Sequence, residues 1–300
     1  MRNPFTWRTI MHFEDLADNG QFSLYRRHRK LLERWAKTRP QYQDLVAMIL
    51  LEEGVACLIQ HRLEEAVDLA KRACRLSSYY SCVNDRVIRG YASAVYAAAD
   101  RFAGNQDGAE ERIVEALEIF EPMEPSTYTS IALYNIGAII MERSASVGVS
   151  AVEEREAVCF LEKAAQHWSH QQLNTTARVL PRIYNRLISL YLKSSPNCAP
   201  DLNLAVSQDN LTRAGAIITR YHSLFSHCSN WMDSTFYLGK TDHCIRSRDI
   251  DGGLTAAQQA LDISVQSKFV RETTGAIERI NLLRELDDLR RRPPELPDRL

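Results

Sequence analysis

The residues with the greatest capacity for chemistry are histidines and cysteines in the last third of the chain. Five of them are potential zinc ligands: His222, His227, Cys228, His243 and Cys244. A structural zinc site usually takes its ligands from two close pairs at short, fixed spacing. Here neighbouring histidines and cysteines point to different sides of a helix, and the sequence has no CxxC or HxxxH. We therefore expect buried thiols and no metal site.

Other signatures of catalysis are also missing from the sequence. It contains no GxxxxGK[ST], GxGxxG, GxSxG or HExxH, which removes the common phosphate-loop, dinucleotide, serine-hydrolase and zinc-protease patterns. Asp287 and Asp288 lack the further aspartate of a diphosphate-binding metal motif. His167 and His170 have no carboxylate at ligand spacing, and they suit the negative end of a helix. We expect a protein that is not an enzyme and uses no cofactor.

The charge balance does not favour a polyanionic partner. The 300 residues include 37 basic and 38 acidic side chains, so the formal net charge is −1. The basic run Arg26–Lys30 and the arginines 290–292 could contact RNA, but a solvated helix face with cations near a helix end explains them more simply. We expect neither a nucleic-acid partner nor a membrane.

Cysteine usage and the N-terminus predict a cytoplasmic protein. The seven cysteines are odd in number, and several lie on apolar helical faces, as free thiols do in a reducing compartment. The N-terminal sequence has no continuous apolar stretch for a signal peptide. The most apolar segment, 45–60, carries Glu52 and Glu53 at its centre and is too short to span a bilayer.

Hydrophobic periodicity and scarce glycine and proline predict an all-α chain of paired helices. Pairs of alanines seven residues apart would let neighbouring helices approach closely. These pairs are Ala66 with Ala73, Ala109 with Ala116, and Ala157 with Ala164. The expected helices are 10–38 (one or two helices), 45–60, 63–77, 85–102, 109–120, 126–143, a helix from about 152, 175–193, a less regular helix to 225, 231–246, a helix to about 267, and 271–291.

These hairpins resemble tetratricopeptide (TPR) repeats. The sequence 133–137, LYNIG, resembles the first-helix core of that family, and residues 236–239 and 183–187 keep parts of it. Ala116-Leu117 and Ala260-Leu261 supply the Ala-Leu pair of the second helices. The alanine landmarks recur at about 43 and 48 residues, longer than the usual 34. The resemblance implies a right-handed superhelix, or α-solenoid, of about five TPR-like hairpins (42–267). Beside it we expect an N-terminal helical cap (1–41), a C-terminal capping helix that covers the end of the stack (268–292) and a disordered, proline-rich tail (293–300).

The resemblance also implies a set of partner-binding residues in a concave groove. Carried over from the family, Asn135 and Asn185 would face this groove and could hold a peptide backbone amide. Tyr134, Tyr184 and Tyr191 would add apolar walls, and Lys240 and His243 could bind an acidic group. A structural interpretation stays open beside this one, because asparagine at this position often bridges neighbouring hairpins and tyrosine often packs between them.

Two functions from different classes follow. The first is a protein–protein interaction adaptor or scaffold that binds a protein or peptide segment in the groove. The alternative is a helical regulator that responds to a small ligand or peptide, either free-standing or as part of a larger signalling protein. A long open channel would favour the adaptor, whereas a closed apolar pocket with convergent polar groups would favour the regulator. The sequence does not set the oligomeric state.

Overall fold

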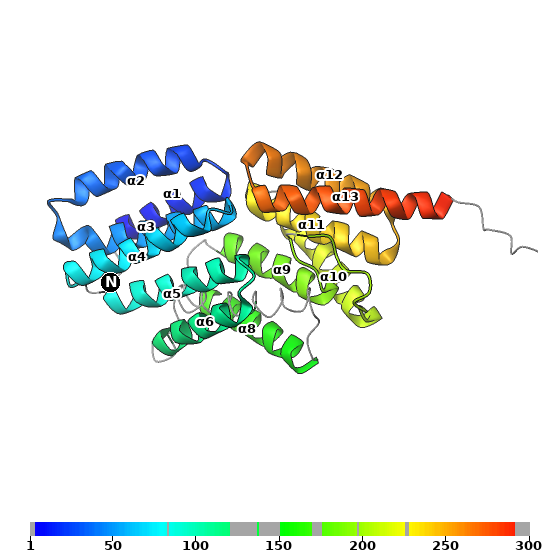
Figure 1. The fold of residues 1–300 in the computed structure, drawn as a ribbon, viewed down its shortest axis with the longest axis horizontal. Coiled ribbons are helices and arrows are strands. Elements are labelled where there is room, and N and C mark those ends of the chain that lie inside the picture. Colours follow the sequence, from blue (N-terminus) through cyan, green and yellow to red (C-terminus); the bar gives the residue numbers. More distant parts are fainter. Residues whose placement is uncertain are drawn as a thin grey trace, which may run out of the picture.

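A computed structural model of the chain describes residues 4–82, 84–120, 137, 151–169, 176–196, 198–225 and 228–291. In these ranges the protein is all-helical and has no β-strand (Figure 1). The predicted helix at 126–143 lies outside the described residues, apart from Gly137. The helices are α1 (Pro4–Asp18), α2 (Phe22–Ala36), the short 3-10 helix η1 (Pro40–Tyr42), α3 (Gln43–Ile59), α4 (Leu63–Tyr79), α5 (Asp85–Phe102), α6 (Gln106–Phe120), α8 (Ala151–Ser169), α9 (Thr176–Leu192), α10 (Gln208–Leu224), α11 (Asn230–Ser247), α12 (Ile250–Ser267) and α13 (Val270–Arg291).

Local sequence explains where several of these helices begin and end. Ser207 and Ser229 cap α10 and α11 by accepting hydrogen bonds from the backbone N–H groups of Asn210 and Met232. α11 ends at Arg248 in the left-handed conformation, with φ of 62°. Asp249 follows directly and caps α12, so the chain reverses within two residues.

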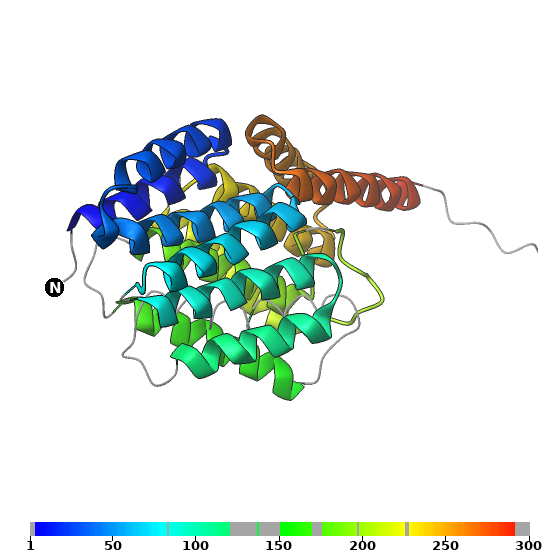
Figure 2. The same cartoon turned by 60° about the vertical axis from the view of Figure 1, so that its left-hand side comes forward.

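Consecutive helices pack against each other, as the alanine spacing predicts. α3 contacts α4, α5 contacts both α4 and α6, and α11 contacts α12. Figure 2 shows α3 to α6 stacked in order along the molecule. All six alanines of the three pairs have no exposed surface. Gly54 adds to this close packing, because a Cβ atom there would lie 3.4 Å from the carbonyl oxygen of Ala66.

The two ends of the described chain meet. α1 contacts α11, and in Figures 1 and 2 α1 and α2 lie beside the α12–α13 pair. Phe269, which precedes α13, is fully buried in a cluster that includes Phe22 and Tyr25. Gly20 lies so close to α12 that a Cβ atom would fall 2.4 Å from the carbonyl oxygen of Ser267. The array of helices is thus closed by contacts between residues far apart in sequence.

No helix within the described residues combines the length and apolar character that crossing a lipid bilayer requires.

Candidate functional site

Asn185 lies on the face of α9 that contacts α11. The other member of the predicted pair, Asn135, lies outside the described residues. Asn185 is buried, and its amide nitrogen donates to the Met232 carbonyl oxygen at 2.9 Å and to Thr235 Oγ1 at 2.8 Å. Its buried Oδ1 has no hydrogen-bond partner in the part of the chain that the structure describes. The donor side of this amide therefore links α9 to α11 within the fold.

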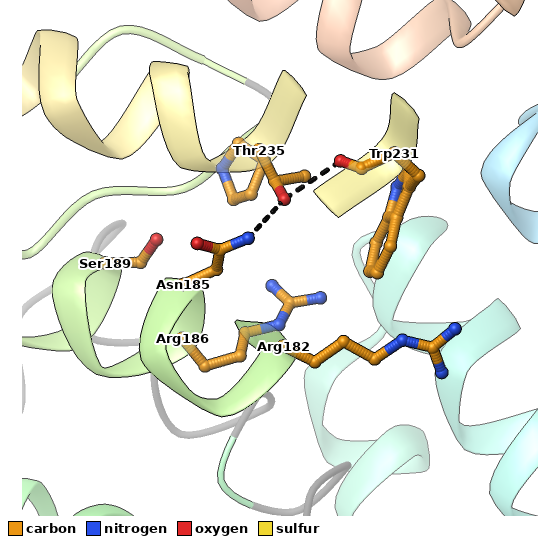
Figure 3. A pocket seen from close by; sticks show the side chains of 7 residues that line it. Arg182, Asn185, Arg186, Ser189, Trp231 and Thr235 are labelled. Atoms are coloured by element: carbon orange, nitrogen blue, oxygen red, sulfur yellow. Dashed lines mark hydrogen bonds between the residues drawn. The ribbon is translucent and has the colours of Figure 1, made fainter. Parts of the chain in front are cut away.

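A small polar recess surrounds Asn185 (Figure 3). The figure shows Arg182 and Arg186 below the amide and the ring of Trp231 to one side, while Thr235 receives its hydrogen bond. The recess has room for about one water molecule, because its open space is close to the minimum that one water needs. As the helices stand, it cannot admit a peptide.

Acidic residues balance the cations of this recess. Arg182 is paired with Asp18, and its guanidinium carbon lies 5.6 Å from the centroid of the Trp231 ring. Trp231 Nε1 donates to Glu272 Oε1 at 3.0 Å. Burial raises the pKa of Glu272, and the positive charges of Arg271 and Arg186 oppose that rise. The recess is thus a charge-balanced part of the closure between the two ends of the chain.

The other predicted site residues lie around α10, and Tyr134 lies outside the described residues. Tyr184 is buried, with its ring 6.3 Å from that of Phe225, and half-buried Tyr191 packs in the same apolar cluster. His243 Nε2 lies 3.0 Å from where a Cβ atom of Gly215 would be, and burial lowers the pKa of this histidine. Lys240 is half-buried on α11. Tyr184 and Tyr191 of α9 therefore pack in an apolar cluster with residues of α10, and His243 of α11 packs against α10.

The histidines and cysteines considered as zinc ligands form no cluster in the described ranges, which contain no group of three potential ligands; His227 is not described. All seven cysteines are free. Burial raises the pKa of Cys228, and it raises that of Cys244 to about 11. Both thiols are therefore protonated and weakly nucleophilic at neutral pH.

Glu52 on α3 has a strongly perturbed carboxyl group. It accepts a hydrogen bond from the Tyr91 hydroxyl at 2.6 Å, and burial raises its pKa to about 7. A buried acid of this kind is a candidate for catalysis when it faces a cleft. Glu52 lines none of the described pockets. We therefore assign it to the interior of the fold.

The basic run on α2 also serves the fold. Arg29 is buried and pairs with Glu33 and Glu53. Arg26 lies 3.7 Å from Glu53 and 3.9 Å from Glu65, so it spans α2, α3 and α4. The expectation of a solvated face is therefore wrong for Arg29, because its buried carboxylate partner Glu53 lies on another helix, α3, and the local pattern of α2 does not indicate it.

A groove with apolar side chains in its lining lies between α2 and α4, over the first half of α3. It encloses about 480 Å³. Val46 and Leu50 form its base, and Leu76, Tyr79 and Tyr80 form one wall. Tyr79 is 80% exposed, so a large aromatic side chain stands in solvent at the groove edge. Its charged lining comprises three cations and one carboxylate: Lys37, Arg72, Arg75 and Glu33.

This groove was not predicted from the sequence. The usable signal was the dipeptide Tyr79-Tyr80 at the end of a helix, where two large aromatics follow the last buried position. The walls come from α2 and α4, which are separated by a whole helix, so their spacing could not be read from local periodicity.

Comparison with known proteins adds no family to this description. No protein-family model matches the chain, and no curated protein matches it.

Proposed function

We propose that this chain is a non-catalytic adaptor that binds a segment of a partner protein in the groove between α2 and α4. The observation that carries the proposal is the groove itself: an open channel with an apolar base, an exposed tyrosine and an excess of cations. Aromatic residues and arginine are enriched where proteins bind one another. Tyr79 supplies such an aromatic at the edge, and Arg75 supplies such a cation.

The proposed architecture is a TPR-like α-solenoid in the cytoplasm. Sequential packing of helices and fully buried alanine pairs support the repeat character. Seven free cysteines support a reducing compartment. The groove of Asn135 and Asn185 stays a prediction of that resemblance, whereas the binding surface proposed here lies on α2, α3 and α4.

Two other hollows in the described structure are weaker candidates for binding: one of about 480 Å³ lies over α5 and α6, and one of about 420 Å³ lies over α4, α5 and α6. They share Asp100 and Arg112, which already form an ion pair at 2.6 Å. The recess at Asn185 is too small for a ligand beyond water size. An open surface that receives a protein segment is therefore favoured over a regulator that encloses a small molecule.

Selection of displayed random peptides on the purified chain tests this proposal. We expect some selected peptides to lose binding to the variant Lys37→Glu/Tyr79→Ala, which changes only exposed side chains of the groove. A matched control, Arg284→Glu/Leu289→Ala, changes an exposed cation and an exposed apolar residue of α13. Peptides that bind both variants and the wild type equally would contradict the groove as the binding surface.

A further inference from the structure

We infer that the occupant of the α2–α4 groove is an acidic amphipathic helix. This inference rests on the proposed function and names the chemistry of the partner. It follows from the charge of the lining, the spacing of its side chains and the state of the backbone around it.

The charge of the groove indicates an acidic partner. Its lining has three cations and one carboxylate, in a chain whose net charge is only −1. The single carboxylate, Glu33, is already bound by Arg29 and Arg72, each at 2.7 Å. Neither Lys37 nor Arg75 has an ion pair with any described residue, and both are exposed. Two cations are therefore left to meet carboxylates of a partner.

The ion pair between Glu33 and Arg72 also limits the groove at one end. It bridges α2 and α4 across α3. The groove continues from there toward Tyr79 and Tyr80, where α2 has ended and the chain crosses to α3 through η1. On α4 it runs from Arg72 to Tyr79, about two helical turns or 11 Å. A short helix of two to three turns matches this length.

The side chains of the groove follow helical spacing. Val46 and Leu50 lie one turn apart on α3. Arg72, Leu76 and Tyr79 lie on one face of α4 at steps of four and three residues. A channel between two roughly aligned ridges receives a third helix through residues at the same spacing, as in helix-in-groove recognition.

The backbone around the groove disfavours an extended peptide. An extended partner needs free N–H and C=O groups to pair with. At the end of α2, the Ala36 carbonyl oxygen accepts from Arg39 N and from Gln43 Nε2, both at 2.8 Å. At the end of α4, the Leu76 and Ser77 carbonyl oxygens accept from Tyr80 N and Cys82 N. A helix satisfies its own backbone, so it is the form of peptide that can lie here without unpaired groups.

Fluorescence anisotropy with defined peptides tests this inference on the full chain. The first probe is a helical peptide with leucines on one face and glutamates beside them. The second carries glutamine for each glutamate, the third has a central proline, and the fourth carries lysine for each glutamate. We expect the first to bind, and the glutamine and proline probes to bind about tenfold more weakly, a difference of about 1.4 kcal/mol.

A charge exchange makes the test specific to the groove. Neither Lys37 nor Arg75 forms an ion pair with a described residue. The variant Lys37→Glu/Arg75→Glu therefore breaks no described ion pair. We expect this variant to prefer the lysine peptide to the glutamate peptide, reversing the wild-type order. Arg284→Glu on α13 should leave the wild-type order unchanged.

Several results would overturn the inference, and they are distinguishable. Equal binding of the glutamate and glutamine peptides would remove the acidic partner, and equal binding of the proline peptide would remove the helix. Stronger binding of a single-stranded oligonucleotide, lost in the Lys37→Glu/Arg75→Glu variant, would assign the groove to nucleic acid. If no defined peptide binds but random-library peptides depend on the groove, the inference fails and the adaptor proposal stands; if neither binds there, both fail.

Discussion

Arg182 Nη2 on α9 donates to both carboxylate oxygens of Asp18 on α1, at distances of 2.9 and 2.8 Å. The two residues are 164 positions apart in the sequence. Asp18 is almost fully buried, whereas Arg182 is about one-quarter exposed. This pair joins the first helix to the second half of the molecule, and the aromatic contact of Phe22 with Phe269 is a second contact between the two halves. It is therefore a marker for closure of the helical array.

Loss of the cation should destabilise the closed array. In Arg182→Met the carboxylate of Asp18 stays buried without its partner, and we expect the free energy of unfolding to fall by about 3 kcal/mol. The double variant Asp18→Asn/Arg182→Met should recover part of this loss, because no unpaired charge is left. Urea unfolding followed by circular dichroism measures both. A single variant as stable as the wild type would show that the pair contributes nothing to closure.

Gly20 is required by the approach of the two chain ends. Its φ is 70°, and an added Cβ atom would meet the carbonyl oxygen of Ser267 at 2.4 Å. Gly20→Ala should therefore cost about 3 kcal/mol of stability, from backbone strain and this overlap together.

Gly104→Ala is a matched control for that substitution. Its φ is 86°, but nothing lies within 4 Å of the added Cβ atom. It should cost only the backbone strain, about 1 kcal/mol. Thermal unfolding of both variants measures the difference. Equal losses of stability would show that the close contact of Gly20 with Ser267 does not add to the cost of Gly20→Ala.

Glu52 should make stability depend on pH. Burial raises its pKa from 4.5 to about 7, so the folded chain keeps this proton at pH values where the unfolded chain has released it. The folded state then binds more protons, and the free energy of unfolding falls as pH rises from about 4.5 to 7, by up to about 3 kcal/mol. Below the unfolded pKa of 4.5, the contribution of Glu52 to the free energy of unfolding is fully present.

The variant Glu52→Gln isolates this contribution. Burial also raises the pKa of Glu53 and of Glu272, which add slopes of the same sign. The difference between the wild type and Glu52→Gln in urea unfolding across this pH range therefore reports Glu52 alone. Parallel profiles for the two proteins would mean that Glu52 titrates normally in the folded state.

Tyr79 should contribute to binding and not to folding. With 80% of its surface exposed, Tyr79→Ala should change the free energy of unfolding by less than about 0.5 kcal/mol. The same variant should weaken binding of groove-dependent peptides by about tenfold or more, as loss of an aromatic contact at an interface does. Paired measurements of urea unfolding and peptide anisotropy check this. A large loss of stability with unchanged affinity would assign the ring to the fold.

Local pattern was sufficient to predict most of the helices. The expected segment 85–102 matches α5, and 271–291 differs from α13 by one residue, because amphipathic periodicity and turn residues act over short distances. The alanine pairs were predicted to be packing positions, and all six are buried.

Contacts between distant segments could not be predicted in this way. Nothing near Asp18 or Arg182 in the sequence indicates that they meet, since closure depends on the sum of small rotations between successive helices. The α2–α4 groove could not be predicted for a similar reason. Its charge depends on which cations are already paired, and the partner of Arg72 lies 39 residues away.

The central claim, that the α2–α4 groove binds a protein segment, is tested most directly by nuclear magnetic resonance of methyl groups. Peptides selected from the random library would be titrated into chain labelled at isoleucine, leucine and valine methyls. We expect saturable shifts at Val46, Leu50 and Leu76 and none at Ile113, which is buried in α6. Shifts confined to Ile188 of α9, with Val46 and Leu50 unchanged, would contradict binding in the α2–α4 groove.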